Sequence, residues 1–130
     1  LARESGEMLD MTAIENKAFL PEDCMAADSV EAFYEALKSN EAVFQKLLKS
    51  AENNDCKLKY VAEFKDGKAE VGLKEIPEGH PFYNLEGKDN IVMFYTNRYK
   101  DQPMIIKGAG AGSEVTASGL FSDIIRIAKN

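Results

Sequence analysis

Two alternating runs of residues flank a turn signal in the middle of the chain, and this feature limits the possible folds most. In KLKYVAEF (57–64) and in AEVGLKEI (69–76), apolar side chains alternate with more polar neighbours. The residues between the runs include Asp66-Gly67, and Asp-Gly is a strong short-range signal for a tight β-hairpin turn. The sequence therefore predicts an antiparallel hairpin over residues 57–76.

Helical periodicity precedes this hairpin. Asp28 stands before SVEAFYEALK, with Glu31 three residues after it, which is typical of a capping box at the start of a helix. Asn40 is a favourable N-cap for a second helix over the residues that follow it. Apolar residues in both segments recur at the spacing of one helix face. Because only a short break separates the segments, we expect a helical hairpin.

The N-terminal part predicts less regular structure. Residues 8–20 are consistent with one irregular strand or two short ones that stop before Pro21, and residues 22–28 with a loop. The first six residues, LARESG, resemble the last turn of a helix, with Gly6 in the left-handed conformation after it. One turn cannot nucleate a helix alone, so we expect the chain to be cut from a longer protein.

The C-terminal third alternates between loop, strands and a helix. Proline and glycine residues predict a loop over 77–90, and the run 90–98 predicts a strand that is apolar on both faces, either central in a sheet or under a partner. A last strand, MIIK (104–107), leads through a glycine turn into a helix that we expect to be largely buried, for example against a domain outside this chain. The order β-α-α-β-β-β-β-α indicates the α+β class, with a mainly antiparallel sheet and helices on one face.

Composition restricts the possible functions. The length of 130 residues corresponds to one soluble domain. The net charge of −6 and the absence of a run of lysine and arginine argue against a surface that binds nucleic acid or an anionic membrane. Cys24, Cys56 and His80 are its only cysteines and histidine, too few for a zinc-type ligand set. No apolar stretch approaches the roughly 20 residues of a membrane span. We therefore expect a cytoplasmic protein with reduced thiols and no metal site.

The glycine turn GAGAG (108–112) admits two interpretations. Backbone amides at the start of a helix can bind a phosphate, and the helix dipole adds to the attraction. The spacing is GxGxG, however, and differs from both the dinucleotide GxGxxG and the P-loop pattern. The pattern alone slightly favours a structural tight turn over a cofactor contact. Thr116 and Ser118 in the following helix could bond a ligand, but capping of the turn is favoured for them.

The other candidate residues predict no catalytic site. His80 has no serine, cysteine or acidic partner at motif spacing, which favours an exposed or loop-bracing histidine over a catalytic one. The acidic residues Glu75, Glu78, Glu86 and Asp89 are explained by a solvated loop rather than by an acid–base pair. The residues alone thus indicate an α+β domain with one suggestive glycine turn and no complete catalytic set.

Residues 80–128 closely resemble the C-terminal end of homoserine dehydrogenases, in particular the form fused to aspartokinase. The resemblance rests on the signature GAGAG-x-x-VTA-x-G-x-x-x-DI over residues 108–124. LKYVAEF (58–64) and the helical segment before it match the family more loosely. LARESG is similar to the tail of the helix that follows the family's catalytic aspartate and lysine. The resemblance covers nearly all of the chain.

This resemblance implies a function for a longer protein. Homoserine dehydrogenases interconvert L-aspartate 4-semialdehyde and L-homoserine with NAD(P)H, in threonine, methionine and isoleucine biosynthesis, and a lysine serves as acid/base. In the family that lysine, the acidic substrate-binding residues and the Rossmann half precede the point where this chain starts. The resemblance therefore implies that this chain contains no catalytic residue, binds no NADP by itself and is inactive alone.

The resemblance also divides the chain by role. Residues 1–107 correspond to part of the substrate-binding and dimerisation region, and residues 108–130 to the segment that contacts the nucleotide-binding domain. Gly112 is expected to lie against NADP or NAD, with Gly110 in the same turn and Thr116 near it.

The same family pattern implies that the sheet of the 57–76 hairpin and the 90–98 strand forms a homo-oligomer. An alternative from another functional class is a stand-alone dimerisation or small-ligand-binding module without catalysis.

Overall fold

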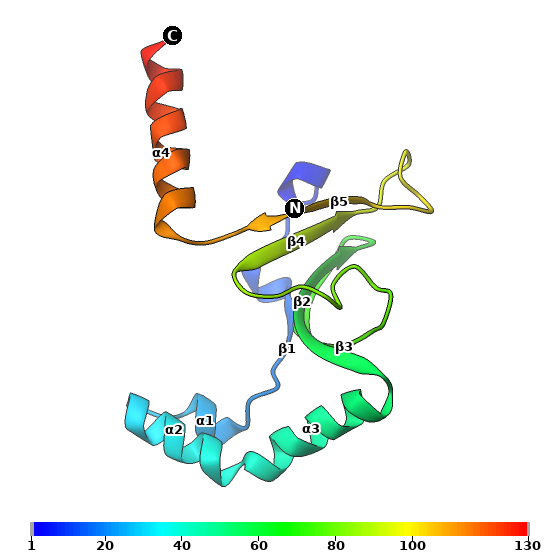
Figure 1. Ribbon diagram of the computed structural model, residues 1–130, viewed down its shortest axis with the longest axis vertical. Coiled ribbons are helices and arrows are strands. Elements are labelled where there is room, and N and C mark those ends of the chain that lie inside the picture. The colour runs from blue at the N-terminus through cyan, green and yellow to red at the C-terminus, as the bar shows by residue number, and fades with distance from the viewer. Residues whose placement is uncertain (1, 130) are drawn as a thin grey trace. The chain divides into compact units, whose positions relative to one another are not determined.

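The computed structural model describes residues 2–129 (Figure 1). The chain divides into two compact units, Leu1–Tyr83 and Asn84–Asn130. Within the described residues, the first unit contains a three-stranded sheet and three α-helices, and the second contains a two-stranded sheet and one α-helix. The α+β class with mainly antiparallel pairing is confirmed.

The predicted β-hairpin is the central element of the first unit. Strands β2 (Cys56–Lys65) and β3 (Lys68–Pro77) pair antiparallel along their whole length. Asp66 and Gly67 join them with φ angles of 50° and 74°. Positive φ at both turn residues is the geometry that Asp-Gly supports, and it matches the twist of the two strands. The hairpin prediction is confirmed.

A short third strand extends this sheet. Strand β1 (Glu15–Lys17) pairs parallel with β3, so that the strand order is β1-β3-β2. Most of the segment 8–20 is therefore not strand, and a 3-10 helix (Met11–Ala13) precedes β1. The Asp10 carboxylate starts that helix by accepting from the Thr12 N–H at 2.8 Å, which is a local bond that competes with strand pairing.

A ladder of charges crosses the three strands. Lys17 Nζ donates to Glu70 at 2.6 Å, and Lys74 Nζ contacts Glu70 at 2.6 Å and Glu63 at 2.5 Å. The hydrogen bonds from Lys17 and then Lys74 lower the pKa of Glu70 to about 2. Glu70 therefore remains ionised between two cations and ties β1 to the hairpin.

Gly72 allows β1 to approach β3 closely. A Cβ atom at this buried position would lie 2.8 Å from Lys17 Cβ and 3.2 Å from the Lys17 carbonyl oxygen. We expect Gly72→Ala to lower the free energy of unfolding by about 1–3 kcal/mol, because an added methyl group forces backbone shifts. Urea unfolding measures this change. In a Lys17→Gly background the same substitution should cost less, and equal costs in both backgrounds would contradict the close-approach argument.

Three helices precede the hairpin. They are α1 (Glu22–Met25), α2 (Val30–Ser39) and α3 (Glu41–Asn53). The two predicted helices α2 and α3 are confirmed, but residues 22–28 are not all loop. The expected packing of the two helices as a helical hairpin is wrong: only Asn40 separates them, they follow one another at an angle (Figure 1), and α2 packs mainly against α1. The predicted capping role of Asp28 is wrong: Ser29 precedes the first helical residue, and its hydroxyl accepts from the Ala32 N–H at 3.2 Å. A capping oxygen must lie directly before the first turn, and Asp28 is one residue too early.

Asn40 occupies the predicted position before α3, but its side chain does not cap that helix. Its amide donates instead to Asp23 Oδ2 at 2.7 Å and to the Ala36 carbonyl oxygen at 2.9 Å. Only this residue separates α2 from α3. Its side chain therefore bonds to the last turn of α2 and joins that turn to α1.

Helix α3 is fixed to the sheet through Glu75. The carboxylate accepts from Ser50 Oγ at 2.8 Å and from Asn54 Nδ2 at 2.9 Å, and these bonds, that from Asn54 first, lower the pKa of Glu75. Glu75 therefore lies in a strand rather than in the expected loop, and although it is exposed it anchors α3 to β3. The described residues with buried apolar side chains in this unit are Cys24, Ala51 and Ile76.

The second unit is a β-hairpin followed by a helix. Strands β4 (Asp89–Phe94) and β5 (Met104–Ala109) pair antiparallel, and α4 (Ser113–Ala128) follows the glycine turn. The predicted strand over 90–98 is too long, because the backbones of Thr96 and Tyr99 bond to each other and form a turn. Its expected place in one sheet with the 57–76 hairpin is also wrong: among the described residues β4 pairs only with β5.

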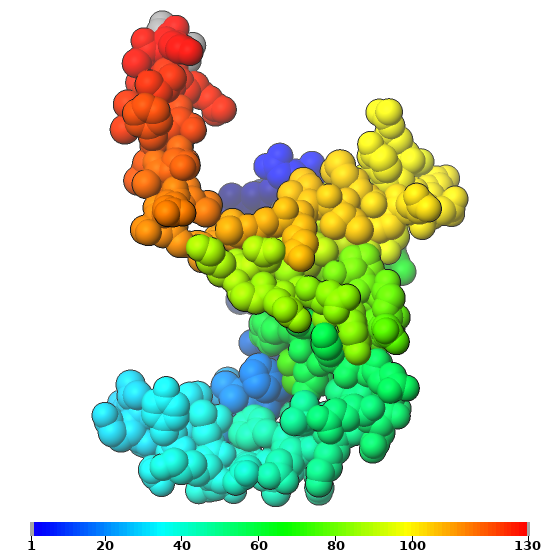
Figure 2. Space-filling view, viewed as in Figure 1, coloured from blue at the N-terminus to red at the C-terminus, as the bar shows by residue number. Residues whose placement is uncertain are grey.

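Helix α4 is exposed in this chain, so the burial expected for it would have to come from a partner outside the chain. Every residue of Ser113–Ala128 is exposed. Its apolar members include Leu120, Phe121, Ile124 and Ile127, each more than 60% exposed. Figure 2 shows the side chains of α4 in orange to red. No helix in residues 2–129 has the length and apolar character needed to cross a bilayer.

Candidate functional site

The glycine turn joins strand β5 to helix α4, as the sequence predicts. Gly108 is still part of β5, and Gly112 is the residue directly before α4. Gly112 has φ of 128° and ψ of 152°. Residues that carry a side chain rarely adopt this backbone conformation, so the last position of the turn requires glycine.

Gly110 is required for a different reason. A Cβ atom there would lie 1.8 Å from Asn90 Nδ2 and 2.4 Å from Asn90 Cγ. The Gly110 N–H also donates to the Lys88 carbonyl oxygen at 3.2 Å. The turn is therefore held against the start of β4. Gly108 differs from both, because a Cβ atom at that position would meet nothing within 4 Å.

Thr116 closes the first turn of α4 onto Gly112. Its N–H and its hydroxyl both donate to the Gly112 carbonyl oxygen, each at 3.1 Å. The hydroxyl proton is thus used inside the helix, in a bond back to the carbonyl four residues earlier, and the expected capping role of Thr116 is wrong because no side chain caps α4. Thr116 fixes the orientation of Gly112, and its hydroxyl oxygen retains lone pairs that can accept a hydrogen bond.

Lys88 is a residue of this site that sequence reasoning missed. Its Nζ lies 3.6 Å from the position that a Cβ atom on Gly112 would occupy. No side chain caps the first turn of α4, which carries the acidic Glu114, and the Lys88 cation lies close to the residue before that turn. Both features favour an anion. Lys88 and Asn90 lie where a loop leads into β4, and no sequence motif marks these two residues. They reach the turn only because Asn90 pairs with Gly108 across the strands.

The other candidate residues form no second site. The His80 imidazole accepts a hydrogen bond from the Phe82 N–H, which agrees with the loop-bracing interpretation. Asp89 lies 3.7 Å from Lys107 Nζ, so it pairs with a cation rather than with a second carboxylate. Cys24 and Cys56 are free. Residues 2–129 bring no three histidine, cysteine or acidic side chains together as a metal site.

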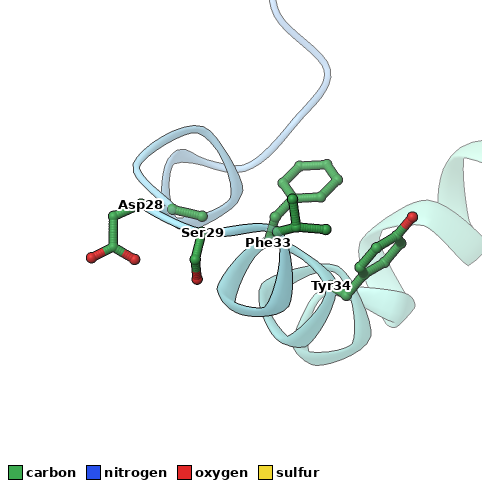
Figure 3. Close-up of a pocket in the computed structure, with 6 residues that line it drawn as sticks. Asp28, Ser29, Phe33 and Tyr34 are labelled. Carbon is green, nitrogen blue, oxygen red and sulfur yellow. The ribbon is translucent and has the colours of Figure 1, made fainter.

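A shallow hollow of about 390 Å³ lies at the start of α2 (Figure 3). It is lined by residues 27–30 together with Phe33 and Tyr34. In Figure 3 the Asp28 carboxylate and the Ser29 hydroxyl point away from the two rings. Because the Ser29 hydroxyl already caps α2, the hollow offers no pair of groups for acid–base chemistry.

Comparison with known proteins identifies the family. The sequence model of homoserine dehydrogenase matches residues 1–125 of the chain. The chain belongs to the homoserine dehydrogenase family. The resemblance found in the GAGAG signature is therefore confirmed, and the strand, the glycine turn and most of the helix described above lie within the matched residues.

Individual relatives support the same assignment. Bifunctional aspartokinase/homoserine dehydrogenase 2 of Arabidopsis thaliana, named as chloroplastic, is 43% identical over 98% of this chain. Bifunctional aspartokinase/homoserine dehydrogenase 2 of Escherichia coli is 36% identical over 99% of this chain. The chain spans only 14% and 16% of the length of these two relatives.

A solved structure shares the fold. The crystal structure of a Candida auris protein of unknown function matches with a TM-score of 0.86 and 36% identity. The match covers 99% of this chain and 37% of that chain. The arrangement of elements therefore recurs inside a larger protein.

Proposed function

We propose that this chain is the C-terminal part of a homoserine dehydrogenase that interconverts L-aspartate 4-semialdehyde and L-homoserine with NAD(P)H. The family match over residues 1–125 carries this proposal. The names of the Arabidopsis and Escherichia coli relatives support an aspartokinase fusion. The reaction would serve threonine, methionine and isoleucine biosynthesis. A cytoplasmic location remains part of the proposal, although the Arabidopsis relative is named as chloroplastic.

Within that enzyme, we assign the glycine turn to one edge of the NADP (or NAD) pocket. Gly112 and Gly110 would let the cofactor approach the backbone, and Thr116 would hold Gly112 in place. The arrangement fits such a group, because Lys88 Nζ lies 3.6 Å from the point where a Gly112 side chain would begin and no side chain caps the first turn of α4. NAD(P)H supplies the hydride when bound, and these residues would only bind and orient it.

The exposed apolar side chains support the separate roles that we propose for residues 1–107 and 108–130. Residues 108–130 would contact the nucleotide-binding domain, and the exposed apolar side chains of α4 are consistent with a helix made to be covered. Residues 1–107 would belong to the substrate-binding and dimerisation region. There Tyr60 of β2 is 56% exposed on an apolar face of the sheet, which supports a homo-oligomer formed through that sheet.

An activity assay on two proteins tests the function. A complete protein that contains this chain should oxidise homoserine with NADP⁺ or NAD⁺, whereas the chain alone should show no turnover even at saturating cofactor. A folded complete protein without this activity would refute the proposed reaction. Turnover by the chain alone would show that catalytic residues lie within residues 1–130.

A further inference from the structure

The loop between β3 and the second unit is closed by hydrogen bonds that all involve His80. The His80 N–H donates to the Pro77 carbonyl oxygen at 3.2 Å, and the His80 carbonyl oxygen accepts from the Tyr83 N–H at 2.9 Å. The third bond uses the side chain: the Phe82 N–H donates to His80 Nδ1 at 3.1 Å. The loop ends at Tyr83, where the first compact unit ends.

The imidazole is packed as well as hydrogen-bonded. It is half-buried, and its ring meets the Phe82 ring edge to face, with the centroids 4.8 Å apart. At the strand ends that adjoin this loop, the charged residues are Lys57 of β2 and Glu75 of β3, and Glu78 belongs to the loop itself. Lys57 Nζ lies over the Tyr83 ring at 4.3 Å, and Glu75 is bonded to α3. Among the described residues no ion pair involves the imidazole.

We propose that His80 makes the closure of the 77–83 loop sensitive to protonation. A neutral imidazole can accept at Nδ1 only when its proton is on Nε2. When a second proton from solvent binds Nδ1, both ring nitrogens become donors, and Nδ1 then faces the Phe82 N–H, which is also a donor. The hydrogen bond is lost, and the backbone that leads into the second unit gains freedom. This inference does not depend on the proposed enzymatic function.

Nuclear magnetic resonance on the 130-residue chain tests this directly. The His80 ring signals and the Phe82 amide signal are followed between about pH 5 and about pH 8, where histidine side chains in general change charge. The Phe82 amide shift should follow the same titration curve as the ring. Its protection from hydrogen exchange, corrected for the intrinsic effect of pH, should fall about fivefold when the ring is charged.

Two variants separate the acceptor from the packing. His80→Asn places an amide oxygen near the position of Nδ1, so the Phe82 amide should remain protected at both ends of the pH range. His80→Leu keeps an apolar side chain without an acceptor, so the same amide should be unprotected at both ends. A Phe82 amide whose shift and protection do not change while the His80 ring titrates would overturn the inference, and so would a ring that does not titrate in this range.

Discussion

Replacing Gly112 by alanine in the complete enzyme is expected to raise the KM for NADP(H) about tenfold or more. Gly112 has φ of 128°, and a side chain in such a region costs about 1–3 kcal/mol. The backbone can relieve that strain only by turning, and turning moves the first amides of α4. The new methyl group would also point towards Lys88 Nζ, 3.6 Å away. A loss of about 1.4 kcal/mol in binding is already tenfold in affinity.

Gly108→Ala is the matched control, because it makes the same chemical change in the same turn. Gly108 has no positive φ, and its added methyl group meets nothing within 4 Å. Its KM for NADP(H) should therefore stay near that of the unmodified enzyme. Steady-state kinetics and fluorescence titration with NADPH measure both variants, with urea unfolding as a check of the fold. Equal effects of the two substitutions, or an unchanged KM in Gly112→Ala, would remove Gly112 from the cofactor site.

The hairpin and the glycine turn could be predicted because the conformational preferences of adjacent residues determine both. Asp66-Gly67 adopts positive φ with little strain, and the alternating residues on either side fix the register of β2 and β3. The change from strand to helix after Gly112 is likewise encoded by adjacent residues. The functional interpretation of the turn, however, came from the family signature, since the spacing alone slightly favoured a plain structural corner.

Contacts between distant residues could not be predicted from these patterns. Lys88 and Asn90 reach the glycine turn only because β4 and β5 pair in one particular register. Asn40 is a residue type that favours the N-cap position, yet its side-chain amide donates a hydrogen bond to Asp23, seventeen positions earlier. The doubly apolar run at 90–98 indicated a strand that is either central in a sheet or under a partner, whereas β4 ends at Phe94 and its apolar side chains remain only partly covered within the described residues. In each case the partner is set by tertiary contacts.

Replacing Ile124 by lysine should change the free energy of unfolding much less in the chain alone than in the complete protein. Ile124 is 61% exposed here, so the substitution should change the free energy of unfolding of the chain by no more than about 0.5 kcal/mol. If α4 packs against the nucleotide-binding domain in the complete enzyme, the same lysine would bury an unpaired charge, and the loss should reach about 3 kcal/mol. Urea unfolding of both proteins measures the difference.

Ser122→Lys provides the control for this comparison, because two positions along an α-helix place Ser122 on the side opposite Ile124. Ser118 and Arg126 lie one turn away from Ser122 in each direction, and Ile125 on the same side is 39% exposed. A lysine at position 122 should be tolerated in both proteins. A complete enzyme that tolerates Ile124→Lys as well would show that this face of α4 remains in solvent, and its exposed apolar side chains would then need another partner. A loss confined to Ile124→Lys in the complete enzyme would place the contact on that face.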